Sequence, residues 1–222
     1  KAVEIRKFFG DIAAVDGITF SVEPGETYGL LGPNGAGKTT TMRMLSGLSP
    51  TNSGSIEVAG IDVVKDNRAV REIMGVVTQH DGLDSGLTVF QNLFLHGFLA
   101  GLSRKDSKNR THEVLEFFGL RERSKDNTYE LSGGMKRRLA IARSMMTNPK
   151  VIVMDEPSTG LDPQSRNRVW EELAVLKDAG VTVLLSTHYM EEATILCDRL
   201  SIMDNGKILH EGTPDQMIDR HA

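Results

Sequence analysis

The chain has almost none of the cysteine that a disulfide framework or a zinc site would require. Its 222 residues include one cysteine, Cys197, so no disulfide can form within the chain. No Cys/His pair has the spacing of zinc ligands. Disulfides are typical of oxidising compartments, and we therefore expect a reducing one. A lone cysteine is usually a buried core residue, and we expect this of Cys197.

Long apolar runs are also absent. A membrane-spanning helix needs roughly 18 or more consecutive apolar residues, and no stretch of the chain reaches that length. The most apolar candidate, residues 87–102, is interrupted by polar side chains such as Gln91 and Asn92. No signal-peptide pattern opens the chain at Lys1. If the protein works at a membrane, we expect another polypeptide to do the spanning.

Basic residues are not in excess. The chain has 26 Lys and Arg against 30 Asp and Glu, a formal net charge of −4 at pH 7. Proteins that bind nucleic acid rely on a positive field, so we expect no nucleic-acid partner, although a local basic patch stays open. Hydrophobic residues make up 39% and charged residues 25% of the chain. This is ordinary globular composition, with enough chain for a sizeable core.

A glycine-rich loop is the first positive signal. Residues 32–39 read GPNGAGKT, the complete phosphate-binding loop pattern. Without bulky Cβ atoms, successive backbone N–H groups can turn inward and form an anion cradle. Lys38 is expected to reach the β and γ oxygens of a nucleotide, and Thr39 to ligate Mg²⁺. By itself the loop indicates only a bound nucleoside triphosphate.

Two further motifs follow in order, LSGGM at residues 131–135 and VIVMDE at residues 151–156. Adjacent carboxylates at the end of an apolar strand are costly if they are buried without a partner, so we expect a cation nearby. Asp155 would hold Mg²⁺ through the coordination shell of the ion, and Glu156 would polarise the attacking water as general base. A purely structural acidic turn is the alternative. Together the three motifs predict an ATP-driven machine.

The order of apolar and amphipathic segments along the chain predicts an α/β fold. Buried strands are expected at residues 26–31, 151–154 and 181–186. Helices are expected at residues 39–48 and 166–177. Alternation of this kind is typical of a parallel sheet.

Other segments differ from this core. Residues 3–22 and 54–58 predict an antiparallel flank over the nucleotide, and residues of about 83–147 predict an inserted helical subdomain. The polar run at residues 103–111 is expected to be a solvated loop. Asn205-Gly206 predicts a hairpin turn, and Thr213-Pro214 predicts the start of a last helix.

The motifs GPNGAGKTT, LSGGM, VIVMDEP and STGLD, together with His188, resemble the ATP-binding cassette (ABC) ATPases over essentially the whole chain. The resemblance implies a P-loop NTPase (RecA-like) parallel-sheet core with an antiparallel β subdomain and an inserted α-helical subdomain, in one nucleotide-binding domain over residues 1–222. It implies ATP hydrolysis with ATP and Mg²⁺ as cofactors. In this family two cassettes sandwich two ATP molecules head to tail, so each γ-phosphate meets the signature of the other subunit.

Ser132, Gly133 and Gly134 match those signature positions. A small-residue turn that opens a helix presents free N–H groups and a positive helix end, which would stabilise charge in trans. Met135 departs from the commoner glutamine of the family, which puts a direct polar contact from this side chain in doubt. Arg137 and Arg138 are expected on a solvated helix face.

The resemblance also implies roles outside the three motifs. His188 matches the switch histidine, which hydrogen-bonds the γ-phosphate and helps to hold Glu156 and the water. Gln79 matches the glutamine that touches Mg²⁺ and the attacking water. Asp162 matches the loop that crosses the dimer interface, and it is also a candidate N-cap. Phe9 falls where the family stacks an aromatic on adenine, with a core phenylalanine as the competing interpretation.

The resemblance assigns the site residues as follows. Catalytic residues are Glu156, His188 and Gln79, and metal-binding residues are Thr39, Gln79 and Asp155. Nucleotide-binding residues are Phe9, Gly32, Pro33, Asn34, Gly35, Ala36, Gly37, Lys38, Thr39, Thr40, Ser132, Gly133, Gly134 and Asp162.

Within the family, residues 131–139 and 186–193 are most similar to the daunorubicin-resistance-type cassettes of exporters. This similarity implies an ATPase subunit of a multidrug, lipid or polysaccharide exporter, peripheral at the cytoplasmic face of the cell membrane. Its partners would be a multi-span membrane permease and a second copy of itself or a related cassette. We expect part of the apolar stretch at residues 87–99 to form the docking groove for a cytoplasmic helix of the permease, with Leu93 and Phe94 as contact residues.

Two alternatives stay open. The first is a soluble cassette protein, such as a translation factor or a DNA-repair ATPase. Translation-factor relatives usually carry two cassettes on one chain, and chromosome-maintenance relatives insert a long coiled coil between the glycine loop and the signature. The second is a GTP switch, for which the Asn/Thr-Lys-x-Asp guanine-reading element is lacking.

Overall fold

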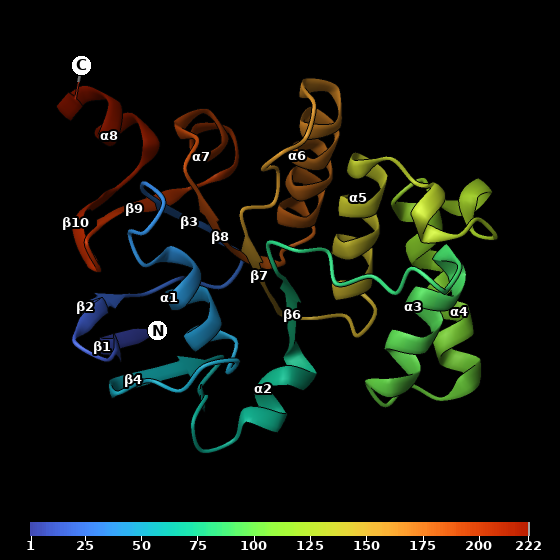
Figure 1. Ribbon diagram of the computed structural model, residues 1–222, viewed down its shortest axis with the longest axis horizontal. Coiled ribbons are helices and arrows are strands. Elements are labelled where there is room, and N and C mark those ends of the chain that lie inside the picture. Colours follow the sequence, from blue (N-terminus) through green and yellow to red (C-terminus); the bar gives the residue numbers. More distant parts are fainter. Residues whose placement is uncertain (222) are drawn as a thin grey trace.

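The central sheet contains the three apolar runs that the sequence predicts as buried strands, and it also contains an edge strand, β6 (Met74–Val77), that the sequence did not predict. The computed structural model describes residues 1–221 and contains a six-stranded sheet in the order β10-β9-β3-β8-β7-β6 (Figure 1). Its parallel strands are β3 (Thr27–Leu31), β6 (Met74–Val77), β7 (Val151–Asp155), β8 (Thr182–Thr187) and β9 (Arg199–Asp204). Strand β10 (Lys207–Gly212) pairs antiparallel with β9. The predicted α/β core is confirmed.

Both faces of this sheet are covered. Along β7, Ile152 and Met154 belong to one buried cluster and Val153 to another. Along β8, Leu185 belongs to the first cluster and Leu184 to the second. Because successive side chains of a strand point to opposite faces, this alternation means that each strand is packed from both sides. Near-continuous apolar runs are what such doubly covered parallel strands require.

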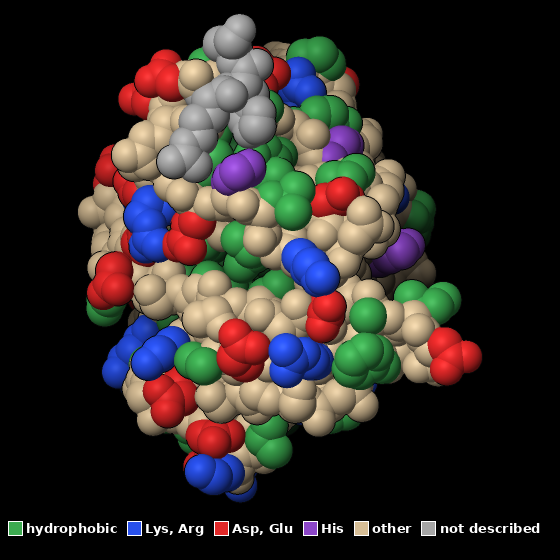
Figure 2. Space-filling model, turned by 90° about the vertical axis from the view of Figure 1, so that its left-hand side faces the viewer, with side chains coloured by type: hydrophobic (Ala, Val, Ile, Leu, Met, Phe, Trp, Pro, Cys, Tyr) green, Lys and Arg blue, Asp and Glu red, His purple; other side chains and the backbone are tan. Residues whose placement is uncertain are grey.

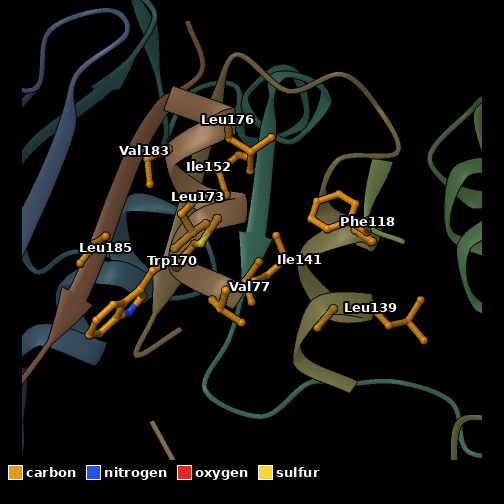
Figure 3. Close-up of a cluster of buried hydrophobic side chains, with 14 of the residues drawn as sticks. Val77, Phe118, Leu139, Ile141, Ile152, Trp170, Leu173, Leu176, Val183 and Leu185 are labelled. Atoms are coloured by element: carbon orange, nitrogen blue, oxygen red, sulfur yellow. The ribbon is translucent and has the colours of Figure 1, made fainter. Parts of the chain in front are cut away.

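The first cluster packs helices on one face of the sheet. Helices α5 (Gly133–Ser144), α6 (Pro163–Asp178) and α7 (Met190–Leu196) contribute to it. In Figure 3, Leu173 and Leu176 of α6 gather with Ile152, while Ile141 of α5 points to Val77 at the end of β6. Leu139 leaves α5 on a different side, directed away from the sheet. Helix α5 therefore joins the sheet to the helices beyond it.

The second cluster lies between the other face, α1 (Lys38–Leu45) and a four-stranded antiparallel sheet. In that cluster Phe20 stacks on Tyr28 of β3, with ring centroids 5.5 Å apart. The antiparallel sheet has the order β2-β1-β4-β5, as the sequence predicts for this flank. Its strands are β1 (Ala2–Phe9), β2 (Ile12–Phe20), β4 (Ser53–Val58) and β5 (Ile61–Asp62).

Helices dominate the middle of the chain. Figure 1 shows α3 (Val89–Leu99) and α4 (Arg104–Phe117) at the end of the molecule farthest from β1 and β2. Short 3₁₀ turns η1 (Arg121–Arg123) and η2 (Thr128–Glu130) lead from them to α5. Helix α2 (Asn67–Ile73) precedes β6.

The solvated loop expected at residues 103–111 is wrong, because this run starts helix α4. The Ser103 side chain accepts a hydrogen bond from the Asp106 N–H and caps the helix. Ser107 and Thr111 are buried and donate to the Phe94 and Ser107 carbonyls at 2.6 and 2.7 Å. Polar residues therefore face inward here with their hydroxyls satisfied.

The turns near the end of the chain agree with the sequence. Asn205 and Gly206 both have positive φ, 46° and 76°, as a two-residue hairpin turn between β9 and β10 requires. Helix α8 (Pro214–His221) starts at the predicted proline, and Thr213 and Gln216 form a reciprocal cap. Cys197 is a buried free thiol, as expected.

The surface gives two further findings. The face in Figure 2, the left-hand side of Figure 1, intermixes acidic and basic side chains and carries no field of one sign. Within residues 1–221, every helix falls short of the combined length and apolarity that crossing a bilayer requires.

Neighbouring residues of α6 offer a test of the first cluster. Leu176 is 2% exposed and Val175 is 49% exposed. Leu176→Ala should lower the free energy of unfolding by about 2–5 kcal/mol, because it leaves a cavity beside the sheet. Val175→Ala should change it by less than about 0.5 kcal/mol. Urea unfolding measures both, and equal losses in the two variants would contradict this packing.

Candidate functional site

The glycine-rich loop connects β3 to α1 at the carboxyl edge of the sheet. Gly37 has φ +101°, and a Cβ on it would lie 2.3 Å from the Ala14 carbonyl oxygen, so only glycine fits. The β9–β10 turn braces the loop, since the Gly206 N–H donates to the Ala36 carbonyl at 3.0 Å. Helix α1 starts directly after the loop. Its positive N-terminal end therefore faces the same place as the loop and favours an anion there.

Lys38 places a buried cation beside this loop. Its side chain is 4% exposed, and Nζ donates to the carbonyls of Gly32 and Pro33 at 2.8 and 3.0 Å. Burial lowers the pKa of Lys38, while the carboxylates of Glu156 and Asp155 oppose that shift. An ammonium group has three N–H donors, so one is left for an incoming phosphate.

Thr39 and Asp155 bring two oxygen ligands together. The Thr39 hydroxyl donates to Asp155 Oδ1 at 3.2 Å. The Ser186 hydroxyl, on β8, donates to the same oxygen at 2.5 Å. Mg²⁺ prefers hydroxyl and carboxylate oxygens of this kind, so the residues present fit this ion. Sequence reasoning missed Ser186, whose hydroxyl fixes the rotamer of the carboxylate.

Glu156 occupies the centre of the site. Oε1 lies 3.3 Å from His188 Nδ1 and 3.7 Å from Lys38 Nζ, and Oε2 accepts from the Thr159 hydroxyl at 3.2 Å. The residue is 6% exposed, and its backbone has φ +48°, a left-handed conformation that is uncommon for a non-glycine residue. Its N–H donates to both the Ser186 carbonyl and hydroxyl oxygens at 3.1 Å. The carboxylate is thus held among a cation, an imidazole and a hydroxyl.

Lys38, Thr39 and Glu156 open into one cleft of about 300 Å³. Asp155 and His188 are not among its described lining residues and reach it through their contacts with Thr39 and Glu156. It is lined by Ala14, Asn34, Gly35, Gly37, Lys38, Thr39, Thr40, Gln79 and Glu156. Gln79 comes just after β6, so it joins the glycine loop and Glu156 from the far edge of the sheet. A larger cleft of about 530 Å³ lies between α2, α3 and α5, away from these charges. The charged side chains of Lys38 and Glu156 gather at the smaller cleft.

Other predicted site residues lie elsewhere. Among the described residues that line the 300 Å³ cleft, none is Phe9, Ser132, Gly133, Gly134 or Asp162. Phe9 is 55% exposed, with Lys7 Nζ 5.4 Å from its ring centroid. The core interpretation of Phe9 is therefore wrong, and its stacking role stays a prediction.

The signature turn caps α5. The Ser132 side chain accepts from the Met135 N–H, and both Ser132 and Gly133 are exposed. Gly134 is buried, and a Cβ there would lie 2.4 Å from Ser165 Oγ on α6. The proposed N-cap role of Asp162 is confirmed, since its carboxylate accepts from the Ser165 N–H at 3.0 Å. The signature is thus presented outward, away from the cleft of its own chain.

Arg137 corrects an expectation. The sequence predicts a solvated helix face for Arg137, but the residue is 4% exposed and donates to loops beside the cleft. Burial lowers the pKa of Arg137, and the carboxylate of Asp81 opposes that shift. The helical spacing gives a signal for this burial. Arg137 lies three residues after Gly134 and four before Ile141, so it shares a helix face with these two buried residues. Arg138 is also mostly buried and contacts Glu172 and the Phe118 carbonyl.

The expected docking residues need correction too. Leu93 is fully buried in the first cluster, and Phe94 is partly buried and stacks against Phe90 and Phe98. A charge at Leu93 would break the core rather than a docking surface. Leu99, at the end of α3, is 75% exposed and lines the 530 Å³ cleft.

Known proteins place the chain in a family. A family model described as ABC transporter matches residues 15–159. Nod factor export ATP-binding protein I of Rhizobium sp. (strain N33) is 46% identical over 217 residues, 98% of this chain and 71% of the relative. The linearmycin resistance ATP-binding protein LnrL of Bacillus subtilis (strain 168) is 44% identical over 220 residues, 99% of this chain and 71% of the relative.

Solved structures agree. The cbiO1 protein of Clostridium perfringens, part of the ABC transporter complex cbiONQ, has a TM-score of 0.89 at 28% identity, covering 99% of this chain and 90% of that one. The dimeric post-hydrolysis ATP-binding cassette MJ0796 with ADP and Pi has a TM-score of 0.86 at 25% identity, and the match covers 96% of this chain and 97% of that one. The P-loop fold prediction is confirmed, and the chain belongs to the ABC transporter family as an ATP-binding, ATP-hydrolysing cassette.

Proposed function

We propose that the chain powers an exporter by hydrolysing ATP as one of two cassettes bound to a separate membrane permease. The observation that carries this proposal is that Lys38, Gln79 and Glu156 line one cleft, with His188 in contact with Glu156. Relatives named for Nod factor export and linearmycin resistance support the exporter class. The place of work would be the cytoplasmic face of the membrane.

Each side chain at the cleft has a distinct part in hydrolysis. Lys38 and the N-terminal end of α1 neutralise the phosphates of ATP. The Glu156 carboxylate accepts a proton from the attacking water, while His188 hydrogen-bonds the γ-phosphate and helps to keep Glu156 and the water in place. Thr39, Asp155 and Gln79 would hold Mg²⁺, which supplies charge neutralisation when it is bound.

A second cassette would complete the site. Ser132 and Gly133 are exposed at the N-terminal end of α5 and lie outside the cleft of their own chain, which suits contact with a nucleotide on another chain. Asp162 and Phe9 would add contacts at the interface and at the base. The cassette is then one domain over residues 1–222, with the helical subdomain of about 83–147 as the part that carries the signature.

The 530 Å³ cleft is the proposed docking site for a cytoplasmic segment of the permease. Leu99, Ala100 and Met74 are apolar residues of its lining, and its charged lining residues are mainly basic. These charged lining residues are Arg68, Arg71, Glu72 and Arg143. A helix that presents an acidic side chain beside an apolar one would match this cleft.

Replacement of the general base tests the chemistry. Glu156→Gln should keep ATP binding and cut turnover by about 100-fold or more, about 2.7 kcal/mol of barrier, because an amide cannot accept the proton. Lys38→Ala should instead weaken nucleotide binding. Phosphate release measures turnover, and titration with a fluorescent nucleotide measures binding. Normal turnover in Glu156→Gln would refute the assignment of the base.

Mixed dimers test the shared site. Lys38→Ala and Ser132→Arg should each be inactive alone, since one lacks the phosphate cation and the other blocks the signature. Mixed in equal amounts, they should regain part of the ATPase rate, because one composite site in the mixed dimer is intact. A mixture as inactive as its parts would mean that each chain works alone.

Co-purification tests the transporter assignment. Tagged wild-type protein from gently solubilised membranes should bring down a multi-span membrane protein, while Leu99→Glu should lose it and keep its own ATPase rate. Val175→Glu, on an exposed face of α6, is the control and should retain the partner. Recovery of ribosomes or DNA-repair proteins instead would favour a soluble cassette, and unchanged binding by Leu99→Glu would refute the docking site.

A further inference from the structure

Arg137 makes more polar contacts than its position on a helix surface would suggest. It lies on α5, which Figure 1 shows between α6 and the helices α3 and α4. Its Nε donates to the Pro157 carbonyl at 2.7 Å, and Nη2 donates to the Asp155 and Glu156 carbonyls, each at 3.0 Å. Three successive carbonyls of the turn after β7 therefore converge on one guanidinium group.

The same guanidinium group also holds the loop after β6. Nη1 donates to the Thr78 carbonyl at 2.7 Å and lies 3.3 Å from Asp81 Oδ1. Gln79, which lines the 300 Å³ cleft, follows Thr78 directly. Arg143, farther along α5, donates to the Asp81 and Gly82 carbonyls and fixes the far side of this loop. One side chain thus links the two loops that carry Gln79 and Glu156.

The turn at Glu156 needs such a restraint. Its φ of +48° is a conformation that costs a non-glycine residue roughly 1 kcal/mol or more, and it persists only where the surroundings over-determine it. Ser186 holds the Glu156 N–H, and Arg137 holds the Glu156 carbonyl. The backbone of the general base is therefore fixed from both sides.

We propose that Arg137 is a positioning residue for ATP hydrolysis, which fixes the turn of Glu156 and the loop of Gln79 to the signature helix α5. The proposal rests on the proposed function, in which the Ser132 end of α5 meets the nucleotide of the other cassette. When the Ser132 end of α5 contacts the nucleotide of the other cassette, any shift of α5 is passed through Arg137 to the turn of Glu156 in the same chain. Arg137 ties the two ATP sites of the dimer together through one helix.

An arginine suits this task better than a lysine. The planar guanidinium group carries five N–H donors in a fixed fork, and here Nε, Nη1 and Nη2 reach carbonyls on two different loops. An ammonium group at the end of a flexible chain offers three donors from one point. It can satisfy one loop well and leaves the other without its partner.

Arg138 provides a matched control on the same helix. It is also mostly buried, and its partners are the Glu172 carboxylate and the Phe118 carbonyl. Neither partner belongs to the cleft. Removing either guanidinium group therefore leaves buried acceptors unsatisfied, but only Arg137 contacts the loops of Gln79 and Glu156.

The test compares Arg137→Gln with Arg138→Gln in ATP binding, thermal unfolding and steady-state hydrolysis. Both variants should lose thermal stability. Arg137→Gln should lower kcat on the order of 10- to 100-fold with KM changed less than about threefold, because a displaced base costs rate rather than ground-state binding. Arg138→Gln should keep kcat within about threefold of the wild type. Arg137→Lys should fall between Arg137→Gln and the wild type.

A double-mutant cycle separates positioning from general damage. In the Glu156→Gln background, Arg137→Gln should slow single-turnover hydrolysis by less than it does with Glu156 present, because only the loop of Gln79 is then left to position. Equal effects of Arg137→Gln with and without Glu156, or equal losses of kcat in Arg137→Gln and Arg138→Gln, would overturn the proposal. If Arg137→Gln does not fold, Arg137→Lys carries the same cycle. A wild-type chain without ATPase activity would instead refute the proposed function itself.

Discussion

A buried ammonium group and two carboxylates meet at the carboxyl edge of the central sheet, and the arrangement of the site depends on this encounter. Lys38 Nζ lies 3.7 Å from Glu156 Oε1, with both residues almost fully buried. Buried charges are costly unless they are paired and hydrogen-bonded. Here each has partners: carbonyls of the glycine loop for Lys38, Thr159 and His188 for Glu156. The site contains both a positive group, Lys38, and negative groups, Asp155 and Glu156. It can therefore accept an anion and a cation together, such as ATP with Mg²⁺.

The topology explains why residues so far apart in the chain meet here. Strands β3, β8, β7 and β6 are adjacent and parallel, so the segments that follow them emerge at one edge. Lys38, His188, Glu156 and Gln79 follow these four strands in turn. Open α/β sheets bind ligands at the carboxyl ends of their strands for this reason. Helix α5 enters from the side and reaches two of these segments through Arg137.

Local chemistry made much of this predictable from the sequence. Apolar runs, the glycine loop and the Asn205-Gly206 turn each have a short-range physical cause, and the structure contains the corresponding strands, cradle and hairpin. The sequence failed where side chains serve distant partners. Residues 103–111 looked solvated, yet Ser107 and Thr111 face inward with their hydroxyls bonded to backbone. The sequence predicts Arg137 on a solvated helix face, but its acceptors lie on loops far away along the chain.

The account depends most on the claim that ATP itself joins two chains across the signature. Light scattering coupled to gel filtration on Glu156→Gln, which should bind ATP without consuming it, measures this directly. The account predicts the mass of one chain with ADP and the mass of two chains with ATP and Mg²⁺. The same mass with both nucleotides would contradict it.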